Sequence, residues 1–285
     1  MKIIFIGATG LLGKPVAKAL SDAGHELTLL ARNELKAKQL FPQLPVRRGD
    51  VFDVASLENA FRGFDAVYIN LSVEQQSRKN EAQPEREGID NILIAAKRTG
   101  MRRVIYLSSL IQRFQGMGGF RWWVFDLKQR AIKNIKESGI PYSIFYPSSF
   151  MDTFINLIKG NNLMIVSGSK QQMWFIAASD YGKQVAKALS IAGDLNQEYV
   201  IQGTESYTWD EAADLVIKNY RKTHLRITKA PLATLRFFSL FSPSIRYVAN
   251  IIYALNNYPE TFESKKTWDD LGKPQITLAE FASNL

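Results

Sequence analysis

The glycine-rich stretch GATGLLG, near the start of the chain, constrains the fold more than any other feature. It follows an apolar run at residues 3–6 and leads into an amphipathic segment at residues 11–23. In a strand–loop–helix unit, Gly7 permits the tight turn, Gly10 lets a diphosphate approach the backbone, and Gly13 allows close helix–strand packing. The helix N-terminus adds free N–H donors and the positive end of its dipole. The stretch therefore predicts a dinucleotide site, with a plain strand–helix turn as the alternative.

The first 150 residues alternate short apolar runs with amphipathic segments. We expect strands at residues 3–6, 26–30, 45–48, 66–70, 104–107 and 142–146. We expect helices at residues 11–23, 34–40, 56–61, 85–99 and 123–138. This alternation predicts an α/β fold with a doubly wound parallel sheet of the Rossmann type. Four glycines, which we expect to close helices in the left-handed conformation, support it: Gly24, Gly63, Gly100 and Gly139.

After residue 150 the alternation becomes irregular. We expect helices at residues 150–159, 180–192 and 209–220, and strands at residues 163–166, 173–176 and 198–201. We therefore divide the chain into an NAD(P)-binding domain at residues 1–150 and a smaller C-terminal α+β lobe at residues 151–285. With 285 residues, the chain can bury one large core with an appended lobe, so we expect a lobe for substrate or partner that does not fold independently.

Composition excludes several kinds of site. The chain has no cysteine, which rules out disulfides, thiolate nucleophiles and cysteine-bound metals. Its two histidines, His25 and His224, are far apart, so we expect no metal site and no serine–histidine triad. The net charge of +9 favours anionic partners, but the basic residues are scattered and no nucleic-acid recognition motif accompanies them. We expect an anionic small ligand and no nucleic acid.

One long apolar region, residues 231–255, is interrupted by Arg236, Pro243 and Arg246, so it does not predict a transmembrane segment. The wider amphipathic segment at residues 232–258 could cover the cleft, form a dimer face or contact a membrane surface peripherally. We expect a cytoplasmic monomer or homodimer.

The end of the second expected strand selects the cofactor. It reads Leu-Leu-Ala-Arg-Asn and carries Arg32 where an NAD site normally has an acidic residue that binds the ribose 2′-hydroxyl. A guanidinium offers a 2′-phosphate a charge-assisted pair of hydrogen bonds. The sequence therefore predicts NADP(H) rather than NAD, with a solvated surface arginine as the alternative.

The spacing Gly-x-x-Gly-x-x-Gly, with Ala-Thr inside it, resembles the short-chain dehydrogenase/reductase superfamily, especially its extended and atypical branches. The resemblance implies that Asp50 and Val51, after the third strand, contact the adenine. Asp53 is expected to cap the next helix together with Ser56.

The carboxyl ends of the fourth and fifth strands carry polar residues at the edge where such sheets bind ligands. These are Asn70, Leu71 and Ser72, and then Ser108 and Ser109. The resemblance implies that a serine here polarises the substrate carbonyl and that a Tyr-x-x-x-Lys pair, one helix later, supplies the proton.

That pair is incomplete. Lys128 lies on the expected helix after the apolar run RWWVF, but the residue four positions earlier is Val124, which has no proton to donate. Lys128 could bind ribose hydroxyls, or act alone as an acid if burial lowers its pKa. The alternative is a surface lysine on a basic helix.

More of the chain resembles one branch, the NmrA-like atypical short-chain dehydrogenases/reductases. The matching stretches are GATGLLG with Arg32, REGIDNILIAAKRTGMRRVIYLSS, FYPSSFMDTF, AASDYGKQVAKAL, YVIQGTESYTWDEAADLV and GKPQITLAEFA. Members bind NADP(H) or NAD(P) and often lack the catalytic tyrosine; some are reductases, and others are redox-sensing regulators. In this chain Tyr146 replaces the arginine that usually precedes Pro147, which implies a phenol near the nicotinamide or a core tyrosine.

The residues that these arguments assign to cofactor binding form one set. They are Gly7, Thr9, Gly10, Leu11, Leu12, Gly13, Arg32, Asp50, Val51, Asn70, Leu71, Ser72, Ser108, Lys128 and Pro147. The expected catalytic residues are Lys128, Ser109 and Tyr146. Asp180 is implied to be structural, capping a helix and bracing the two lobes. Seven aromatic residues form either an apolar substrate pocket or core: Phe120, Trp122, Trp123, Phe125, Phe150, Trp174 and Phe175.

Three functions remain open. The first is an NADPH-dependent reductase of a small apolar carbonyl, quinone or enone. The second is a non-catalytic, NADP-sensing regulator or assembly factor, which the absent tyrosine favours. A nucleotide-sugar epimerase, the third, normally needs the missing Tyr-x-x-x-Lys pair.

Overall fold

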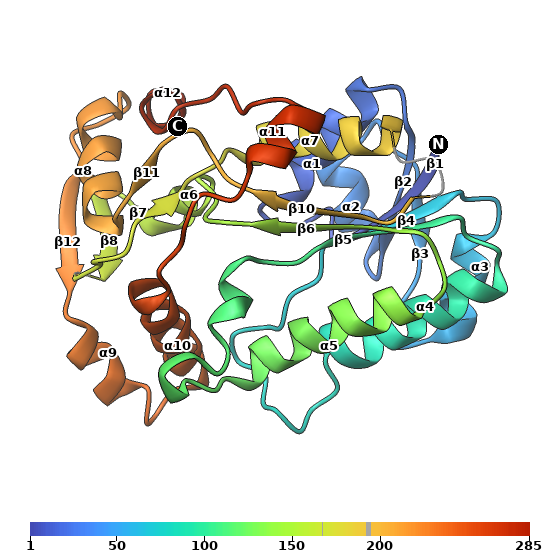
Figure 1. The fold of residues 1–285 in the computed structure, drawn as a ribbon, viewed down its shortest axis with the longest axis horizontal. Helices are drawn as coiled ribbons and strands as arrows, with labels where there is room; N and C mark the ends of the chain where they lie inside the picture. The colour runs from blue at the N-terminus through green and yellow to red at the C-terminus, as the bar shows by residue number, and fades with distance from the viewer. Residues whose placement is uncertain (167, 192–194) are drawn as a thin grey trace.

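The structure, a computed structural model, describes residues 1–166, 168–191 and 195–285. Its centre is a seven-stranded sheet in the order β10-β6-β5-β4-β1-β2-β3, in which every neighbouring pair is parallel (Figure 1). The strands are β1 (Lys2–Ile6), β2 (Glu26–Ala31), β3 (Val46–Arg48), β4 (Ala66–Ile69), β5 (Arg103–Leu107), β6 (Tyr142–Pro147) and β10 (Gln197–Ile201). The strand order reverses beside β1, and ligands bind at such a switch point in open α/β sheets.

Helices cover both faces of the sheet (Figure 1). On one face lie α1 (Gly13–Asp22), α7 (Ala178–Ile191) and α11 (Lys265–Leu271). On the other lie α3 (Val54–Phe61), α4 (Ile89–Arg98) and α5 (Trp123–Glu137), with α2 (Glu34–Leu40) between β2 and β3 along the chain. A short π-helix, η1 (Pro84–Gly88), precedes α4, and two 3₁₀ turns, η2 (Ile111–Phe114) and η3 (Met117–Gly119), follow β5.

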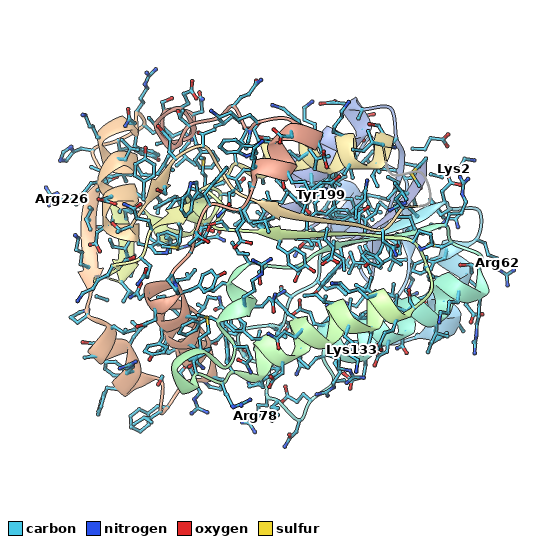
Figure 2. All side chains as sticks on the ribbon, in the orientation of Figure 1. Lys2, Arg62, Arg78, Lys133, Tyr199 and Arg226 are labelled. Carbon is cyan, nitrogen blue, oxygen red and sulfur yellow. The ribbon has the colours of Figure 1, made fainter. Side chains whose placement is uncertain are left out.

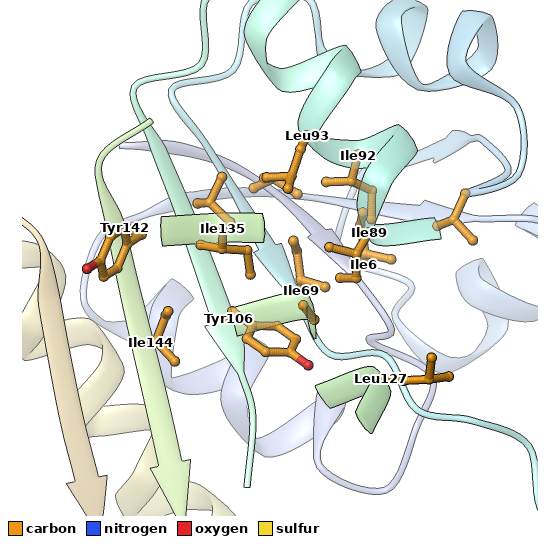
Figure 3. Close-up of a cluster of buried hydrophobic side chains, with 14 of the residues drawn as sticks. Ile6, Ile69, Ile89, Ile92, Leu93, Tyr106, Leu127, Ile135, Tyr142 and Ile144 are labelled. Carbon is orange, nitrogen blue, oxygen red and sulfur yellow. The ribbon is translucent and has the colours of Figure 1, made fainter. Parts of the chain in front are cut away.

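The hydrophobic core has two layers, one on each face of the sheet. The layer under α3, α4 and α5 includes Ile6, Ile69, Ile92 and Ile135, and Figure 3 shows these side chains converging between helices and strands. The layer under α1 and α7 includes the buried tyrosines Tyr68 and Tyr181, whose hydroxyls are 3.0 Å apart. Burial on both faces explains why the strands read as continuous apolar runs.

A second lobe follows β6 and has its own apolar cluster, built on Phe154, Leu163, Phe175 and Val216. It contains two small sheets, β12-β8-β7 and β11-β9. Its strands are β7 (Ile158–Lys159), β8 (Asn162–Val166), β9 (Met173–Trp174), β11 (Ser206–Tyr207) and β12 (Arg226–Ala230). Its helices are α6 (Thr153–Leu157), α8 (Trp209–Asn219), α9 (Leu232–Phe238), α10 (Pro243–Asn257) and α12 (Leu278–Ser283).

The predicted Rossmann-type sheet is confirmed, but β10 and α7 need a correction. We predicted both in the second lobe, whereas β10 pairs in parallel with β6 and extends the main sheet. The helix before β10, α7, packs closely on α1: a Cβ on Gly182 would lie 2.7 Å from the Cβ of Ala19 on α1, so glycine lets the two helices approach this closely. A division at residue 150 therefore separates elements that share one sheet. The predicted helix end at Ala192 lies outside the described residues.

The helix predicted at residues 150–159 is also shorter than expected. It ends at Leu157, and the chain turns at Gly160, with φ of +57°, into the antiparallel β7–β8 pair. The other local predictions agree with the structure. The four expected helix-closing glycines all have positive φ, and Ser56 N donates to Asp53 Oδ1 at 3.2 Å at the start of α3.

Within the described residues no helix has the length and apolar character needed to span a membrane. The same part of the chain contains no group of three histidine, aspartate or glutamate side chains that could hold a metal ion.

Candidate functional site

The glycine loop forms a narrow backbone cradle between β1 and α1. Gly7 has φ of +87°, and a Cβ at this position would lie 1.9 Å from the carbonyl oxygen of Asn70, which directly follows β4. A Cβ on Gly13 would lie 2.0 Å from the carbonyl oxygen of Ala8. Gly10 is exposed, and α1 begins with no acidic residue in its first turn and no side-chain cap. The loop thus presents a positive helix end with free N–H groups, which fits a diphosphate.

The remaining residues of the predicted loop site surround this cradle. Thr9 and Leu11 are exposed, and Leu12 is half-buried immediately before α1. Their backbone therefore lies at the surface where a ligand reaches the helix end.

Arg32 directly follows β2 and is exposed. Within the described residues it forms no ion pair, so its guanidinium is available to an anion. Asp50 follows β3, and its carboxylate accepts a hydrogen bond from Phe52 N at 3.0 Å. Val51 is buried, and its carbonyl accepts from Asn91 at 3.0 Å. These positions run along the edge of the sheet on the β2–β3 side of the cradle.

The ends of β4 and β5 reach the same edge. Asn70 directs its amide to the carbonyl of Gly7 at 3.4 Å, Leu71 packs on the core below, and Ser72 is exposed. The hydroxyl oxygens of Ser108 and Ser109 are buried and have no hydrogen-bond partner of ordinary geometry, although Ser108 lies near enough to the Tyr106 hydroxyl to lower its pKa against the larger effects of burial and Glu85. A buried hydroxyl without a partner is costly, so these two oxygens are available for a ligand atom.

The two serines face different ways. The backbone ladder between β5 and β6 continues past Leu107, because Ser108 N donates to Phe145 O and Leu110 N to Pro147 O. Alternation along this extended segment places Ser108 on the face of Tyr106 and Leu110, which is the face that α5 covers. Ser109 then lies on the opposite face.

Lys128, on α5, is paired with a carboxylate that the sequence analysis did not identify. Its Nζ lies 2.5 Å from Glu85 Oε1, and the two side chains are 14% and 0% exposed. The second oxygen, Glu85 Oε2, is buried and has no hydrogen-bond partner. The alternative of a solvated surface lysine does not describe this geometry, and neither does a lysine acting alone.

Two tyrosines lie close enough to this carboxylate for its charge to raise their pKa values. The hydroxyl of Tyr106 donates to Glu85 Oε1 at 3.4 Å, and burial, followed by the Glu85 charge, raises the pKa of Tyr106 well above its usual value. Burial and then Glu85 also raise the pKa of Tyr247, on α10, to about 12. Both phenols are therefore neutral near pH 7. We call Lys128, Glu85, Tyr106 and Tyr247 the Lys128 cluster.

No signal in the sequence identifies Glu85. It lies in the segment PEREG, which forms η1, and this π-helical turn, a feature that often occurs at functional sites, is seen only in the structure. The sequence alone shows several acidic residues near one another, so nothing distinguishes Glu85 from Glu81 or Glu87. The distance along the chain, 43 residues from Lys128, hides the pairing.

Tyr146 is buried, and its hydroxyl donates to Glu198 on β10 at 2.7 Å. Burial is the main cause that raises the pKa of Tyr146, with the Glu198 hydrogen bond next. The proton of this phenol is thus directed to Glu198, which favours the core role over the catalytic one. Pro147 ends β6 at the ligand-binding edge, with its carbonyl occupied by Leu110 N.

Asp180 links the two lobes as expected, because its carboxylate accepts hydrogen bonds from Gln275 N at 2.7 Å and from Ile276 N at 2.8 Å. The expected cap, however, comes from Asp152, whose Oδ2 accepts Ala178 N at 2.8 Å at the start of α7. Asp152 stands 26 residues before Ala178, at the start of α6, so this cap connects two helices that are distant in the sequence.

The seven aromatic residues do not form one pocket. Phe125, Phe150 and Phe175 pack in three different apolar clusters. Phe120 stacks on Tyr253, and Trp174 contacts Phe262. Trp122 and Trp123 line a cavity together with Tyr247.

Comparison with known proteins agrees with this geometry. Residues 7–190, more than half of the chain, match a family described as NAD(P)H-binding. The Photosystem II assembly factor Ycf39 of Guillardia theta is 26% identical over 260 residues, which cover 88% of this chain and 80% of that protein.

Two solved structures share the fold over nearly the whole chain. A nucleoside-diphosphate-sugar epimerase from Staphylococcus aureus superposes with a TM-score of 0.78 at 21% identity, covering 99% of this chain and 100% of that one. An NADPH-dependent quinone oxidoreductase from Escherichia coli, solved with NADPH, has a TM-score of 0.76 at 22% identity and 99% coverage of both chains.

Proposed function

The chain belongs to the NAD(P)H-binding family, and from this premise we propose that it is an NADP(H)-dependent reductase of a small carbonyl, quinone or enone compound. Bound NADPH would supply a hydride. The observation that carries the proposal is the pair of buried, unpartnered hydroxyls of Ser108 and Ser109 at the sheet edge beside the glycine cradle. Each hydroxyl can donate a hydrogen bond to a ligand oxygen on its own face of the sheet.

The residues of this chain fit the cofactor. Gly7 and Gly13 let the loop pack closely against the backbone of Asn70 and Ala8, and Gly10 is exposed where a diphosphate would approach. Arg32 is exposed beside β2, and its guanidinium suits a ribose 2′-phosphate, which favours NADP(H) over NAD. Adenine contacts at Asp50 and Val51, and ribose or nicotinamide contacts at Asn70, Leu71, Ser72 and Pro147, remain part of the proposal.

The reaction end uses a lysine without the usual tyrosine. The ammonium of Lys128 is held by Glu85, which limits its position to one side of α5. In this arrangement Lys128 donates hydrogen bonds to a ribose or substrate oxygen and stabilises negative charge that develops there. Ser108 faces the same side of the sheet as Lys128, so we assign it the polarising role. Ser109, on the opposite face, is the alternative that the test below compares with it. Tyr146 retains only a supporting role, because its hydroxyl is bound to Glu198.

A non-catalytic assembly factor or NADP-responsive regulator is the second candidate. The observations that favour it are Val124 in place of the proton-donating tyrosine and the likeness to the assembly factor from Guillardia theta. An epimerase has less support: it shares the fold at 21% identity, but this chain lacks the tyrosine.

The test combines binding with turnover. Calorimetry measures NADPH and NADH affinity, and loss of nicotinamide absorbance follows turnover with a panel of quinones and enones. The variants are Ser108→Ala, Ser109→Ala and Lys128→Arg, which keeps a cation beside Glu85. We expect turnover that falls at least tenfold in Ser108→Ala or Ser109→Ala while NADPH affinity changes little.

The outcomes separate the candidates. NADPH binding without turnover above background supports the regulator. Binding of neither coenzyme overturns both functions. If all three variants turn over as fast as the wild type, the roles assigned to the serines and to Lys128 are wrong.

A further inference from the structure

A large cavity lies beside the Lys128 cluster. It has a volume of about 710 Å³ and is enclosed by the loop after β4 (residues 75–79), the start of α5 and the first turns of α10. This volume is within the range of small-molecule sites. Tyr247 lines the cavity and packs edge to face on Trp122, which also lines it, and burial and then the charge of Glu85 raise the pKa of this tyrosine. The cavity is therefore a candidate for the substrate of the proposed reductase.

The charge of the cavity has one sign. No aspartate or glutamate is among the described residues that line the cavity. Four of these residues are cationic: Arg78, Lys79, Arg121 and Arg246. In the described chain none of the four side chains forms an ion pair with a carboxylate. Arg246 is fixed by the carbonyls of Ser239 and Leu240, at 3.0 and 3.3 Å, which leaves its charge uncompensated. A cleft of one sign with apolar walls concentrates ions of the other sign.

The start of α10 adds to this potential. The helix has 15 residues, begins with Pro243 and has no acidic residue in its first turn. Ser242 caps it through Ile245 N at 3.4 Å. The positive end of the helix dipole therefore faces the cavity from the same side as Arg246.

The walls are flat and aromatic. Four rings line the cavity: Trp122, Trp123, Phe241 and Tyr247. The rings of Trp122 and Tyr247 pack edge to face, with centroids 5.0 Å apart, so their positions are fixed by each other. Phe241 is 74% exposed at the rim. Rigid aromatic faces next to guanidinium groups suit a planar ring system, which can stack on both.

We propose that this cavity binds a planar aromatic ligand that carries a carboxylate, sulfonate or phosphate group. Its ring stacks against the tryptophans, and its anion pairs with the four cations. This inference names the substrate class of the proposed reductase and rests on that function for the reaction, but not for the binding itself. An uncharged ligand with the same ring leaves the cations unpaired and binds more weakly.

The experiment compares two ligands with one ring system. Calorimetry on the full chain measures the affinity of naphthalene-2-sulfonate and of 2-naphthalenemethanol, at low and at high salt. The pocket variant is Arg78→Gln/Lys79→Gln. The matched control, Lys222→Gln/Arg226→Gln, removes the same charge from the second lobe, where Arg226 lies well away from Arg78 (Figure 2).

We expect the sulfonate to bind at least tenfold more tightly than the alcohol, with an affinity that falls as salt rises. The pocket variant should lose at least tenfold in sulfonate affinity, and the control should stay within about twofold. Arg121→Gln should also weaken sulfonate binding.

Three results overturn the proposal: equal affinity for both ligands, equal losses in the pocket and control variants, or competitive displacement of the sulfonate by NADP⁺, which would place the anion in the dinucleotide site. These results do not coincide with failure of the reductase. Turnover of neutral quinones without sulfonate binding removes only the substrate class, and sulfonate binding without turnover removes only the reaction.

Discussion

The glycine loop and the Lys128 cluster lie on the same edge of the sheet but are built in different ways. The loop consists of backbone from one short stretch, is open to solvent, and uses the absence of side chains at Gly7 and Gly13. The Lys128 cluster consists of side chains from η1, β5, α5 and α10, and its central carboxylate is fully buried.

Because of this difference, we expect changes in the loop to affect coenzyme binding and changes in the cluster to affect the stability of the fold. A change beside the open loop should alter coenzyme affinity with little effect on folding, because water replaces the lost ligand contacts. A change in the buried cluster should alter folding first, because water cannot reach the charge that is left behind. Four measurements can break or sharpen this contrast.

The largest effect is expected for Lys128→Met. It leaves Glu85 buried without a counter-charge and should lower the free energy of unfolding by about 3–5 kcal/mol. The double variant Lys128→Met/Glu85→Leu removes both charges and should regain most of this loss. As a control, Lys18→Met breaks an exposed pair with Asp22 and should cost at most about 1 kcal/mol. Urea denaturation measures all three, and a Lys128→Met cost no larger than the control value would refute the buried-pair interpretation.

Gly7→Ala should show that the loop also has a steric limit. An alanine held at this positive φ lowers the free energy of unfolding by about 1–2 kcal/mol. Overlap of its Cβ with the Asn70 carbonyl lowers it by about 1–3 kcal/mol more. Gly24→Ala is the matched control: φ is +82° there, but no atom lies within 4 Å, so only the cost of φ should remain. Urea denaturation gives the stabilities and calorimetry the NADPH affinity. Equal losses for the two variants would mean that the close approach at Gly7 is unimportant.

Arg32→Glu should change affinity and leave stability nearly unaltered. Loss of a charge-assisted hydrogen bond of about 1.5–3 kcal/mol predicts NADP⁺ binding weaker by about 10–100-fold, while NAD⁺ binding is retained or improved. The free energy of unfolding should stay within about 0.5 kcal/mol, as for other surface changes. Arg62→Glu, at another exposed site, controls for the change in net charge (Figure 2). Equal NADP⁺ affinity in the Arg32 and Arg62 variants would remove the role of Arg32.

The smallest effect concerns pH. Burial raises the pKa of Glu260 above 4.5, against hydrogen bonds from Gln202 and Ser148 that lower it. Because the folded state holds this proton more tightly, the associated stability is present at low pH and is lost as pH rises through the raised pKa. Glu260→Gln removes this loss, so its stability relative to the wild type should improve from about pH 4 to about pH 8. Denaturation at several pH values measures the difference, and a constant difference would contradict the burial effect.

Much of the fold was predictable because it depends on local patterns. Continuous apolar runs indicated parallel strands, the glycines marked helix ends, and Asp53 and Ser56 indicated a helix start. The placement of β10 was not predictable, since nothing in its sequence says which sheet it joins. In the structure α7 packs closely against α1 at Gly182, and β10, which follows α7, pairs with β6.

The candidate site was predictable to a similar extent. The loop and Arg32 follow from spacing, whereas Glu85 carries no local signal and was missed. Tyr146 was placed at the correct strand end, but its partner Glu198 belongs to the strand whose position was predicted wrongly. The cationic cavity joins residues 75–79, 121–123 and α10, which are far apart in the sequence.

The sequence alone determined the parallel sheet, the glycine cradle and the cation beside the second strand, because each is specified within a few residues by periodicity, by missing side chains or by charge. Only the tertiary structure decided that Lys128 meets Glu85, that Tyr247 closes the cluster and that the basic residues share one cavity. These contacts join segments dozens of residues apart, and they form only when burial of the apolar faces brings the segments together.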